Sequence, residues 1–389
     1  MKILVVSPFF PYKNVPHAGG HYILELLKGL AKKHEVHFLS RIEPEERKYL
    51  SEVLPLCRAL SLYPFETPKK RNALGVLRIL HSYLRLGIKA NRFLDENRFD
   101  IVLVEYVETA LMMGKSQNCQ MVMDAHDIIS KPAERRYRGA KKLSKKVLLY
   151  LFWNGVKGIE TFITSRFHLV FTRSDIDKRY LLQMRPGARV VTVAHPIKKL
   201  YGPRKPEAGK FRILFAGAMH RAVNQDAVRF VYEKVLPEVR RQVPEAEFCV
   251  VGNKPPRFIK EYAEKDKAVK VTGFVPDIMA YYEKASVFVA PLFIGGGIIA
   301  KNLDAMGAGV PVVTSTIGNE GIGAVQGESV LIAESPEEFS RCIVQLLQDS
   351  EFARKISEGG RMFVKTRFAP DVIERLVEDN LSALVAGNR

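Results

Sequence analysis

The stretch from Ala290 to Val313 contains residue types that suit binding of an anion. It reads as the end of a buried strand, the glycine triplet Gly295-Gly296-Gly297, and a short helix with Lys301 and Asp304 on adjacent turns. Glycines let the backbone approach a ligand closely, and helix amide groups with a lysine nearby suit a phosphate. The stretch predicts a phosphate site, although the triplet alone is equally compatible with a structural turn.

Two further candidate groups lie in the first half of the chain. The sequence Asp124-Ala-His-Asp127 places His126 and Asp127 at a strand end, and Gly19-Gly20 precedes an apolar helix pattern. Each has a structural alternative: the glycines can simply start a helix, His126 can be a hydrogen-bonded strand-end histidine, and Asp127 or Asp304 can cap or pair. No Asp-x-Asp motif is suitably placed, so we expect no essential metal and no cofactor.

The cysteines do not form a metal or disulfide pattern. Cys57, Cys119, Cys249 and Cys342 are far apart, without a Cys-x-x-Cys pair or a histidine at ligand spacing. This pattern is typical of reduced core thiols.

Strand and helix patterns alternate along the chain and predict two doubly wound α/β sheets. Ile23, Leu26, Leu27 and Leu30 form one face of a helix after the Gly19-Gly20 turn. In the first half the expected strands are 2–6, 35–39, 101–104, 120–123, 169–172 and 190–193. In the second half they are 211–215, 246–251, 269–271, 287–290, 310–313 and 329–332.

The 389 residues suit two domains, and their 47 % hydrophobic content is unlike that of a disordered chain. Ligands of open α/β sheets lie beyond the carboxyl ends of the strands, so two facing sheets would form one deep cleft. The expected organisation is a first domain over 1–200, a Pro/Gly-rich linker at 201–210, a second domain over 211–369 and a helix at 370–389 that returns to the first domain.

The formal net charge of +18 favours anionic partners. Basic residues alternate with apolar ones in two acid-poor segments, from Lys69 to Arg92 and from Lys131 to Lys146, as in amphipathic helices with a basic face. Such faces can be simply solvated or can dock on an anionic membrane. Nucleic acid is not an expected partner because no binding motif accompanies the charge.

The opening apolar run is broken at Pro8 and lacks a small-residue cleavage site, and no stretch is long enough to span a bilayer. We therefore expect a cytoplasmic protein that can associate peripherally with the inner membrane face.

Several motifs, taken in order, resemble the retaining GT-B glycosyltransferases of family 4, the glycosyl transferases group 1. The first half agrees more loosely, through the opening strand, Gly19-Gly20 and Asp124-Ala-His-Asp127. The closer matches are Phe215-Ala-Gly-Ala-Met219, Asn224-Gln-Asp-Ala-Val228, Val250-Val-Gly252, Val271-Thr-Gly-Phe-Val-Pro-Asp277, Pro291 to Val313, and Gly318-Asn-Glu-Gly321.

The resemblance implies transfer of a sugar from a UDP- or GDP-linked donor to a glycan or lipid-linked acceptor in cell-surface polysaccharide or glycolipid synthesis. It places Gly19 and Gly20 near the donor phosphates and acceptor, and His126 facing the donor sugar. The backbone at Phe274 and Val275 would hold the nucleobase, and Asp304 the ribose hydroxyls.

The chain also departs from the family pattern. The two usual glutamates are replaced by Gly296 and Asp304, and the arginine and lysine that clamp the diphosphate are replaced by Ala218 and Val223. We expect Arg221, Lys301 and the Gly295–Gly297 loop to stabilise the leaving diphosphate instead.

The resemblance favours retention by attack of the acceptor on the leaving-group side, with the phosphate oxygen accepting the proton and no enzyme nucleophile. His126, Asp127 and Lys301 are the catalytic candidates. An inactive relative that binds a nucleotide sugar or partner is the alternative, and a sugar-nucleotide epimerase is a third hypothesis. A dehydrogenase is disfavoured because the first strand is not followed by Gly-x-Gly-x-x-Gly.

Overall fold

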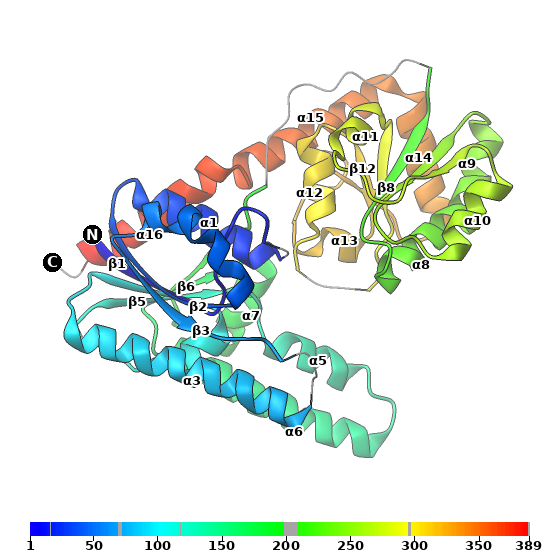
Figure 1. Cartoon of the computed structure of the whole chain (residues 1–389). Helices are drawn as coiled ribbons and strands as arrows, with labels where there is room; N and C mark the ends of the chain where they lie inside the picture. The colour runs from blue at the N-terminus through cyan, green and yellow to red at the C-terminus, as the bar shows by residue number, and fades with distance from the viewer. Residues whose placement is uncertain (16, 69–71, 117, 198–208, 295–296, 388–389) are drawn as a thin grey trace. The chain divides into compact units, whose positions relative to one another are not determined.

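The computed structural model describes residues 1–15, 17–68, 72–116, 118–197, 209–294 and 297–387. The chain forms two compact units (Figure 1). One comprises Met1–His195 with Ile373–Arg389, and the other comprises Pro196–Val372. The domain limits predicted at 200, 211 and 370 stay predictions, and most of the expected linker lies outside the described residues.

The first unit is built on a seven-stranded parallel sheet with the strand order β3-β2-β1-β4-β5-β6-β7. Its central strands are apolar runs buried on both faces, as parallel sheets covered by helices require. Strand order reverses between β1 and β4, so loops after these two strands flank the topological switch point. The strands are β1 Lys2–Ser7, β2 Glu35–Ile42, β3 Ala59–Pro64, β4 Ile101–Glu105, β5 Gln120–Ala125, β6 Leu169–Thr172 and β7 Val190–Thr192.

Helices cover both faces of this sheet (Figure 1). Right-handed connections place α1 on one face and α3, α4, α6 and α7 on the other. Leu86, Ala90, Ala110, Ile163 and Leu181 of these latter helices join one apolar core against the sheet. The helices are α1 Ala18–Ala31, α2 Leu50–Val53, α3 Ala73–Glu96, α4 Val107–Leu111, α5 Ser130–Arg138, α6 Leu143–Thr164, α7 Asp175–Met184 and α16 Pro370–Ala386, with 3-10 turns at Pro44–Tyr49 and Leu54–Leu56.

The second unit repeats the architecture with a six-stranded sheet in the order β10-β9-β8-β11-β12-β13, all parallel. Its switch point lies between β8 and β11. The strands are β8 Arg212–Ala216, β9 Glu247–Val251, β10 Val269–Val271, β11 Val287–Ala290, β12 Val312–Thr314 and β13 Leu331–Ile332. The helices are α8 Ala222–Phe230, α9 Leu236–Gln242, α10 Arg257–Lys265, α11 Met279–Lys284, α12 Ala300–Gly307, α13 Thr316–Glu320, α14 Pro336–Gln348 and α15 Ser350–Arg367, with a π-helical turn at Val231–Val235.

The twelve predicted strands correspond to strands of the two sheets, and the prediction of two α/β domains is confirmed. Strand β3 was not predicted. The expected Gly19-Gly20 turn is wrong, because helix α1 already begins at Ala18 and both glycines lie in its first turn. The four cysteines are free thiols, as expected. Among the described residues, no helix is long and apolar enough to cross a membrane.

Candidate functional site

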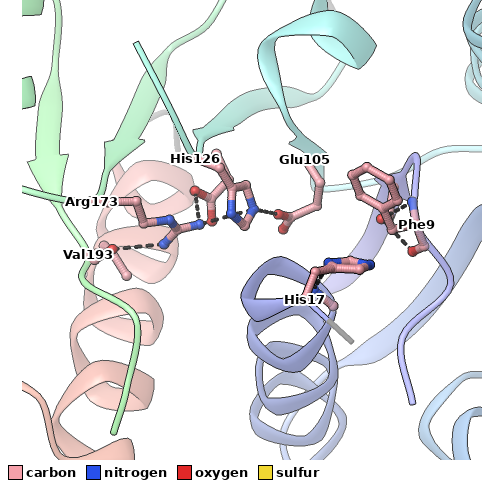
Figure 2. Close-up of polar contacts among 9 residues, drawn as sticks. Phe9, His17, Glu105, His126, Arg173 and Val193 are labelled. Atoms are coloured by element: carbon pink, nitrogen blue, oxygen red, sulfur yellow. Dashed lines mark hydrogen bonds and ion pairs between the residues drawn. The ribbon is translucent and has the colours of Figure 1, made fainter. Parts of the chain in front are cut away.

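The candidate residues fall into two groups, each at the carboxyl ends of the strands of its own unit. In the first unit, His126 follows β5 and lies beside Glu105 at the end of β4 (Figure 2). His126 Nε2 is 2.6 Å from Glu105 Oε2 and 3.2 Å from Arg173 Nη2. The other nitrogen, Nδ1, has no hydrogen-bond partner among the described residues. Nδ1 is therefore the ring atom that His126 can offer to a ligand.

Buried charges around His126 compensate each other. Arg173 is paired with Asp124 and donates from Nη1 to the Val193 carbonyl oxygen at 2.8 Å. Burial and the negative charge of Asp124 raise the pKa of Glu105 well above its usual value. Burial and the positive charge of Arg173 lower the pKa of His126 well below its usual value. The network therefore favours a protonated Glu105 and a neutral imidazole.

The tautomer follows from the donors that face Nε2. Arg173 can only donate, and a protonated Glu105 can donate to the same nitrogen. We assign the hydrogen of the neutral ring to Nδ1, which makes this atom a donor toward a ligand oxygen.

Aromatic packing holds the imidazole plane. Tyr106 stacks on His126 with ring centroids 3.9 Å apart and an interplanar angle of 5°. Tyr106 has a positive φ of 69°, a strained backbone conformation for a residue of this size. Tyr22 and His195 pack at the edges of the same histidine. Burial, followed by the charge of Arg173, lowers the pKa of His195 to about 3, so it too is neutral.

Gly19 and Gly20 are required by close packing. A Cβ on Gly19 would lie 1.7 Å from the Tyr106 hydroxyl oxygen, and one on Gly20 would lie 2.7 Å from the methyl groups of Val15. His17 caps helix α1 by accepting a hydrogen bond from the Gly20 amide at 3.0 Å. The glycine pair thus brings the start of α1 against Tyr106 and the histidine stacked on it.

Asp127 is set apart from this network. It is exposed, whereas Asp124 is fully buried and paired with Arg173. The structure therefore brings Gly19, Gly20 and His126 into one packed group, while Asp127 faces solvent beside it.

Glu105, Asp124 and His126 have ligand atoms close enough to hold a cation together. The guanidinium group of Arg173, however, already lies against the carboxylate of Asp124 and Nε2 of His126. Since a metal at this point would meet a fixed positive charge, we interpret the cluster as an internally compensated network.

In the second unit, Lys301 is the central charged group. Its Nζ donates to Asn224 Oδ1 at 2.6 Å and lies 4.4 Å from the centroid of the Phe215 ring. Burial, followed by the charge of Arg221, lowers its pKa to about 7. A Cβ on Gly217 would lie 2.8 Å from Lys301 Nζ, so this glycine packs directly against the amine.

Asn224 shapes the loop that follows β8. Its Nδ2 donates to the Ala218 carbonyl oxygen at 2.9 Å, and the neighbouring Gln225 donates to the Met219 carbonyl oxygen at 2.8 Å. Arg221 is the N-cap residue of α8, with an exposed side chain. The loop thus carries an exposed cation close to the start of a helix, beside the half-buried Lys301.

The other predicted residues lie at the same edge of the sheet. Gly217, Gly252 and Gly273 follow the adjacent strands β8, β9 and β10, and the Gly252 amide donates to the Gly273 carbonyl oxygen at 3.0 Å. Phe274 is 75 % exposed and Val275 is half-buried. Both are open to a planar ligand at this edge.

Helix α12 carries Lys301 and Asp304, as the sequence predicted. Gly295 and Gly296 lie outside the described residues. Gly297 has a φ of 76°, and a Cβ on Gly321 would lie 2.3 Å from its carbonyl oxygen. The end of the glycine loop is therefore packed tightly against the Gly318–Gly321 motif.

Sequence reasoning missed Tyr22, Glu105, Tyr106, Arg173 and His195. Four of the five lie within three residues after strands that were predicted, namely 101–104, 169–172 and 190–193. The rule that ligands bind beyond strand ends could have selected them. Their stacking and pairing depend on nonlocal contacts that no sequence pattern marks.

Residues 210–349, all within the second unit, match the family model described as Glycosyl transferases group 1. We refer to these matched residues as the group 1 domain. The Lys301 group, Phe274 and Val275 all belong to the matched residues, whereas His126 and its partners lie outside them.

The fold of the whole chain is that of GT-B glycosyltransferases. Sucrose-phosphate synthase from Thermosynechococcus elongatus matches with a TM-score of 0.69 and 17 % identity, covering 99 % of each chain. HepE from Anabaena in complex with UDP matches with a TM-score of 0.65 and 13 % identity over 98 % of this chain and 100 % of that one. WaaG, a glycosyltransferase involved in lipopolysaccharide biosynthesis, matches with a TM-score of 0.59 and 16 % identity over 97 % and 98 %.

A curated relative is similar over nearly the full length. It is an uncharacterized 44.6 kDa protein in the cps region of Klebsiella pneumoniae, 24 % identical over 94 % of this chain and 96 % of that protein. The group 1 domain and the GT-B fold together support a glycosyltransferase.

Proposed function

We propose that the protein transfers a sugar from a UDP- or GDP-linked donor to a glycan or lipid-linked acceptor. The observation that carries the proposal is Lys301, a half-buried amine beside Arg221 within the group 1 domain. A half-buried cation whose neighbours are a neutral amide and an aromatic ring is suited to an incoming diphosphate. The similar HepE structures contain UDP or UDP-glucose, which supports a nucleotide-sugar donor.

Each candidate residue has a role in this proposal. Lys301, Arg221 and the Gly295–Gly297 loop stabilise the negative charge that develops on the leaving diphosphate. The backbone at Phe274 and Val275 holds the nucleobase, and Asp304 accepts hydrogen bonds from the ribose. In the first unit, His126 donates from Nδ1 to a sugar hydroxyl, Gly19 and Gly20 keep α1 close to it, and the exposed Asp127 contacts the acceptor.

We propose that transfer retains the anomeric configuration and uses no metal. The acceptor oxygen forms a bond to the anomeric carbon as the bond from that carbon to the phosphate oxygen breaks. The released phosphate oxygen takes the acceptor proton, so no side chain acts as a nucleophile. An identical anomeric configuration in donor and product would support retention. Full activity in the presence of EDTA would support transfer without a metal.

The first experiment is thermal unfolding with UDP, GDP, ADP and NAD. A ligand at a hundred times its dissociation constant stabilises by about 2.7 kcal/mol, enough to raise the midpoint by several degrees. We expect a shift with UDP or GDP, and its loss in Lys301→Met. A shift with NAD alone would overturn the proposal. The nucleotide that binds then names the donors to test for turnover.

A second candidate function rests on the departures at Ala218, Val223, Gly296 and Asp304. Because these positions lack the usual family groups, an inactive relative would bind a nucleotide sugar or partner without transferring the sugar. It predicts stabilisation by UDP or GDP, with no nucleoside diphosphate released in the presence of any acceptor. An epimerase, the less favoured third possibility, would convert the donor without an acceptor.

The setting that we propose is synthesis of a cell-surface polysaccharide or glycolipid on the cytoplasmic side of the membrane. The similar protein in a cps region and WaaG's involvement in lipopolysaccharide biosynthesis support this choice.

A further inference from the structure

Helices α3 and α6 of the first unit expose many large apolar side chains. On α3, Leu77 and Leu84 are 61 % and 47 % exposed, and on α6, Leu148 and Leu151 are 67 % and 62 % exposed. Soluble proteins rarely leave so large an apolar patch uncovered without a binding function. The full set is Leu74, Val76, Leu77, Leu80, Leu84 and Ile88 on α3, and Leu143, Val147, Leu148, Tyr150, Leu151, Phe152, Ile159 and Phe162 on α6.

The exposed residues of α3 lie opposite its core face. Ser82, Leu86 and Ala90 recur every four residues and are buried. Leu77, Leu84 and Ile88 recur at intervals of seven and four, which places them on one stripe turned away from that core face. The helix therefore has a second apolar stripe directed outward from the sheet.

Helix α6 has the same arrangement. Glu160 and Ile163 are buried on its inner side, and Glu160 accepts a hydrogen bond from the Ile129 amide at 2.8 Å. A Cβ built on Gly155 or Gly158 would have no neighbouring atom within 4 Å, so none of the described residues covers the outer side at these two positions. Since α3 and α6 lie on the same face of the sheet, their outward stripes belong to one surface of the first unit (Figure 1).

Basic residues border this apolar surface. Arg78 and Arg85 are exposed beside the α3 stripe, and Lys141, Lys142 and Lys145 are exposed at the start of α6. These three lysines form no ion pair with any described residue. The sequence has no acidic residue from 67 to 94 or from 135 to 159. Within these two ranges all charged side chains are therefore basic.

We infer that the outward faces of α3 and α6 dock on an anionic lipid bilayer, with the apolar side chains entering the interface and the basic side chains contacting headgroups. The combination of an apolar centre and a positive border matches such a surface. A second copy of the chain would bring two positive borders together, and a nucleic acid would leave the apolar stripes uncovered.

Sedimentation of the full chain with vesicles tests this inference and requires no turnover, so it stands apart from the transferase proposal. We expect binding to vesicles of phosphatidylcholine mixed with phosphatidylglycerol, and much weaker binding to phosphatidylcholine alone. Added salt should weaken binding by screening the headgroup contacts. Equal binding to both vesicles, or binding to neither, would overturn the inference.

Variants separate the two contributions. Lys142→Gln with Lys145→Gln should weaken partitioning about 25-fold, since each basic residue near the surface contributes about fivefold. Leu148→Ser, Leu151→Ser and Phe152→Ser together should weaken it at least about tenfold at every salt concentration. All five positions are exposed, so folding should persist, and unchanged circular dichroism checks this.

Matched controls come from the second unit. Lys267→Gln with Lys355→Gln removes two equally exposed charges, and Val325→Ser with Met362→Ser removes exposed apolar side chains. Neither control should change vesicle binding. Two outcomes would show that the assigned surface is wrong. In the first, these controls reduce vesicle binding as much as the α6 variants do. In the second, the triple serine variant of α6 converts a dimer into a monomer and leaves vesicle binding unchanged.

Discussion

Neutral histidines in a charged surrounding define the first unit's candidate site at the scale of single residues. His126 and His195 both lie near the guanidinium of Arg173, which disfavours a second positive charge. The positive charge of Arg173 is in turn balanced by Asp124. Such a network holds an imidazole in one tautomer and orientation, which suits a hydrogen-bond donor better than a proton shuttle.

Removing Arg173 should be far more damaging than neutralising Glu105. Arg173→Met leaves the buried carboxylate of Asp124 without its partner, and we expect a loss of about 3–5 kcal/mol. Glu105→Gln resembles the protonated acid already present and should change stability by less than about 1 kcal/mol at neutral pH. Urea unfolding measures both, and equal losses would contradict the assigned protonation.

The pH dependence has a defined sign. The pKa of Glu105 is higher in the folded chain than in the unfolded chain, where it is about 4.3. At a pH between these two pKa values, the folded state therefore binds more protons than the unfolded state. This group therefore makes stability fall as pH rises through that window. In Glu105→Gln the free energy of unfolding should decrease less steeply as the pH rises.

Lys301 should couple nucleotide binding to proton uptake. Its pKa of about 7 leaves most of the amine neutral at pH 8, and a bound diphosphate would raise that pKa. UDP or GDP affinity should thus decrease above pH 7, by up to about tenfold per pH unit. Calorimetry in buffers of different ionisation enthalpy measures the proton taken up.

The variants Lys301→Met and Lys267→Met complete this test. The first should bind nucleotide weakly and without the pH slope, and the second, which removes an exposed lysine of the same unit, should behave like the native chain. A native affinity that is constant from pH 7 to pH 9 would argue against Lys301 as the diphosphate partner.

At the scale of elements, strand patterns were predictable because buried parallel strands are short apolar runs with polar ends. Strand β3 escaped because it is a half-buried edge strand that ends in Pro64. The start of α1 was displaced because glycines favour turns by themselves. Here they lie in the first turn of the helix, where Gly19 packs against Tyr106 and Gly20 against Val15. The position of Lys301 and Asp304 on one helix was predictable from local spacing. The Glu105–His126–Arg173 contacts were not, because they join three separate strand ends.

Gly19→Ala should disturb the first turn of α1 and the stack behind it. The added methyl would lie 1.7 Å from the Tyr106 hydroxyl oxygen, so the tyrosine must move off His126. We expect a loss of about 1–3 kcal/mol, typical of overpacking. In Gly19→Ala with Tyr106→Phe the nearest clash is removed, so the loss should be partly recovered. Thermal unfolding of both single variants and the double variant measures the coupling between positions 19 and 106. If the stability losses of the two single variants simply added up in the double variant, the contact between Gly19 and Tyr106 would be refuted.

At the scale of the whole molecule, the C-terminal helix ties the end of the chain to the first unit. Helix α16 buries Ile373, Val377, Leu381 and Leu384. Glu378 Oε2 lies 2.6 Å from His34 Nε2, and Glu374 pairs with Lys32 at 2.6 Å. Helix α16 therefore packs within the first unit, whereas the residues that match the group 1 model end at 349.

Deleting residues 373–389 should selectively loosen the first unit. Four buried aliphatic side chains contribute roughly 6–12 kcal/mol, at about 1.5–3 each, which is comparable to the stability of an entire domain. Hydrogen exchange should accelerate in β1, β2 and β4 and stay slow in β8, β9 and β11. Leu381→Ala should show the same pattern at a cost of about 2–5 kcal/mol, and the exposed Asp379→Ala should show no effect. If hydrogen exchange accelerated equally in both sheets, the loss of α16 would also have destabilised the strands of the second unit. The two units would then unfold together, and the prediction would be wrong.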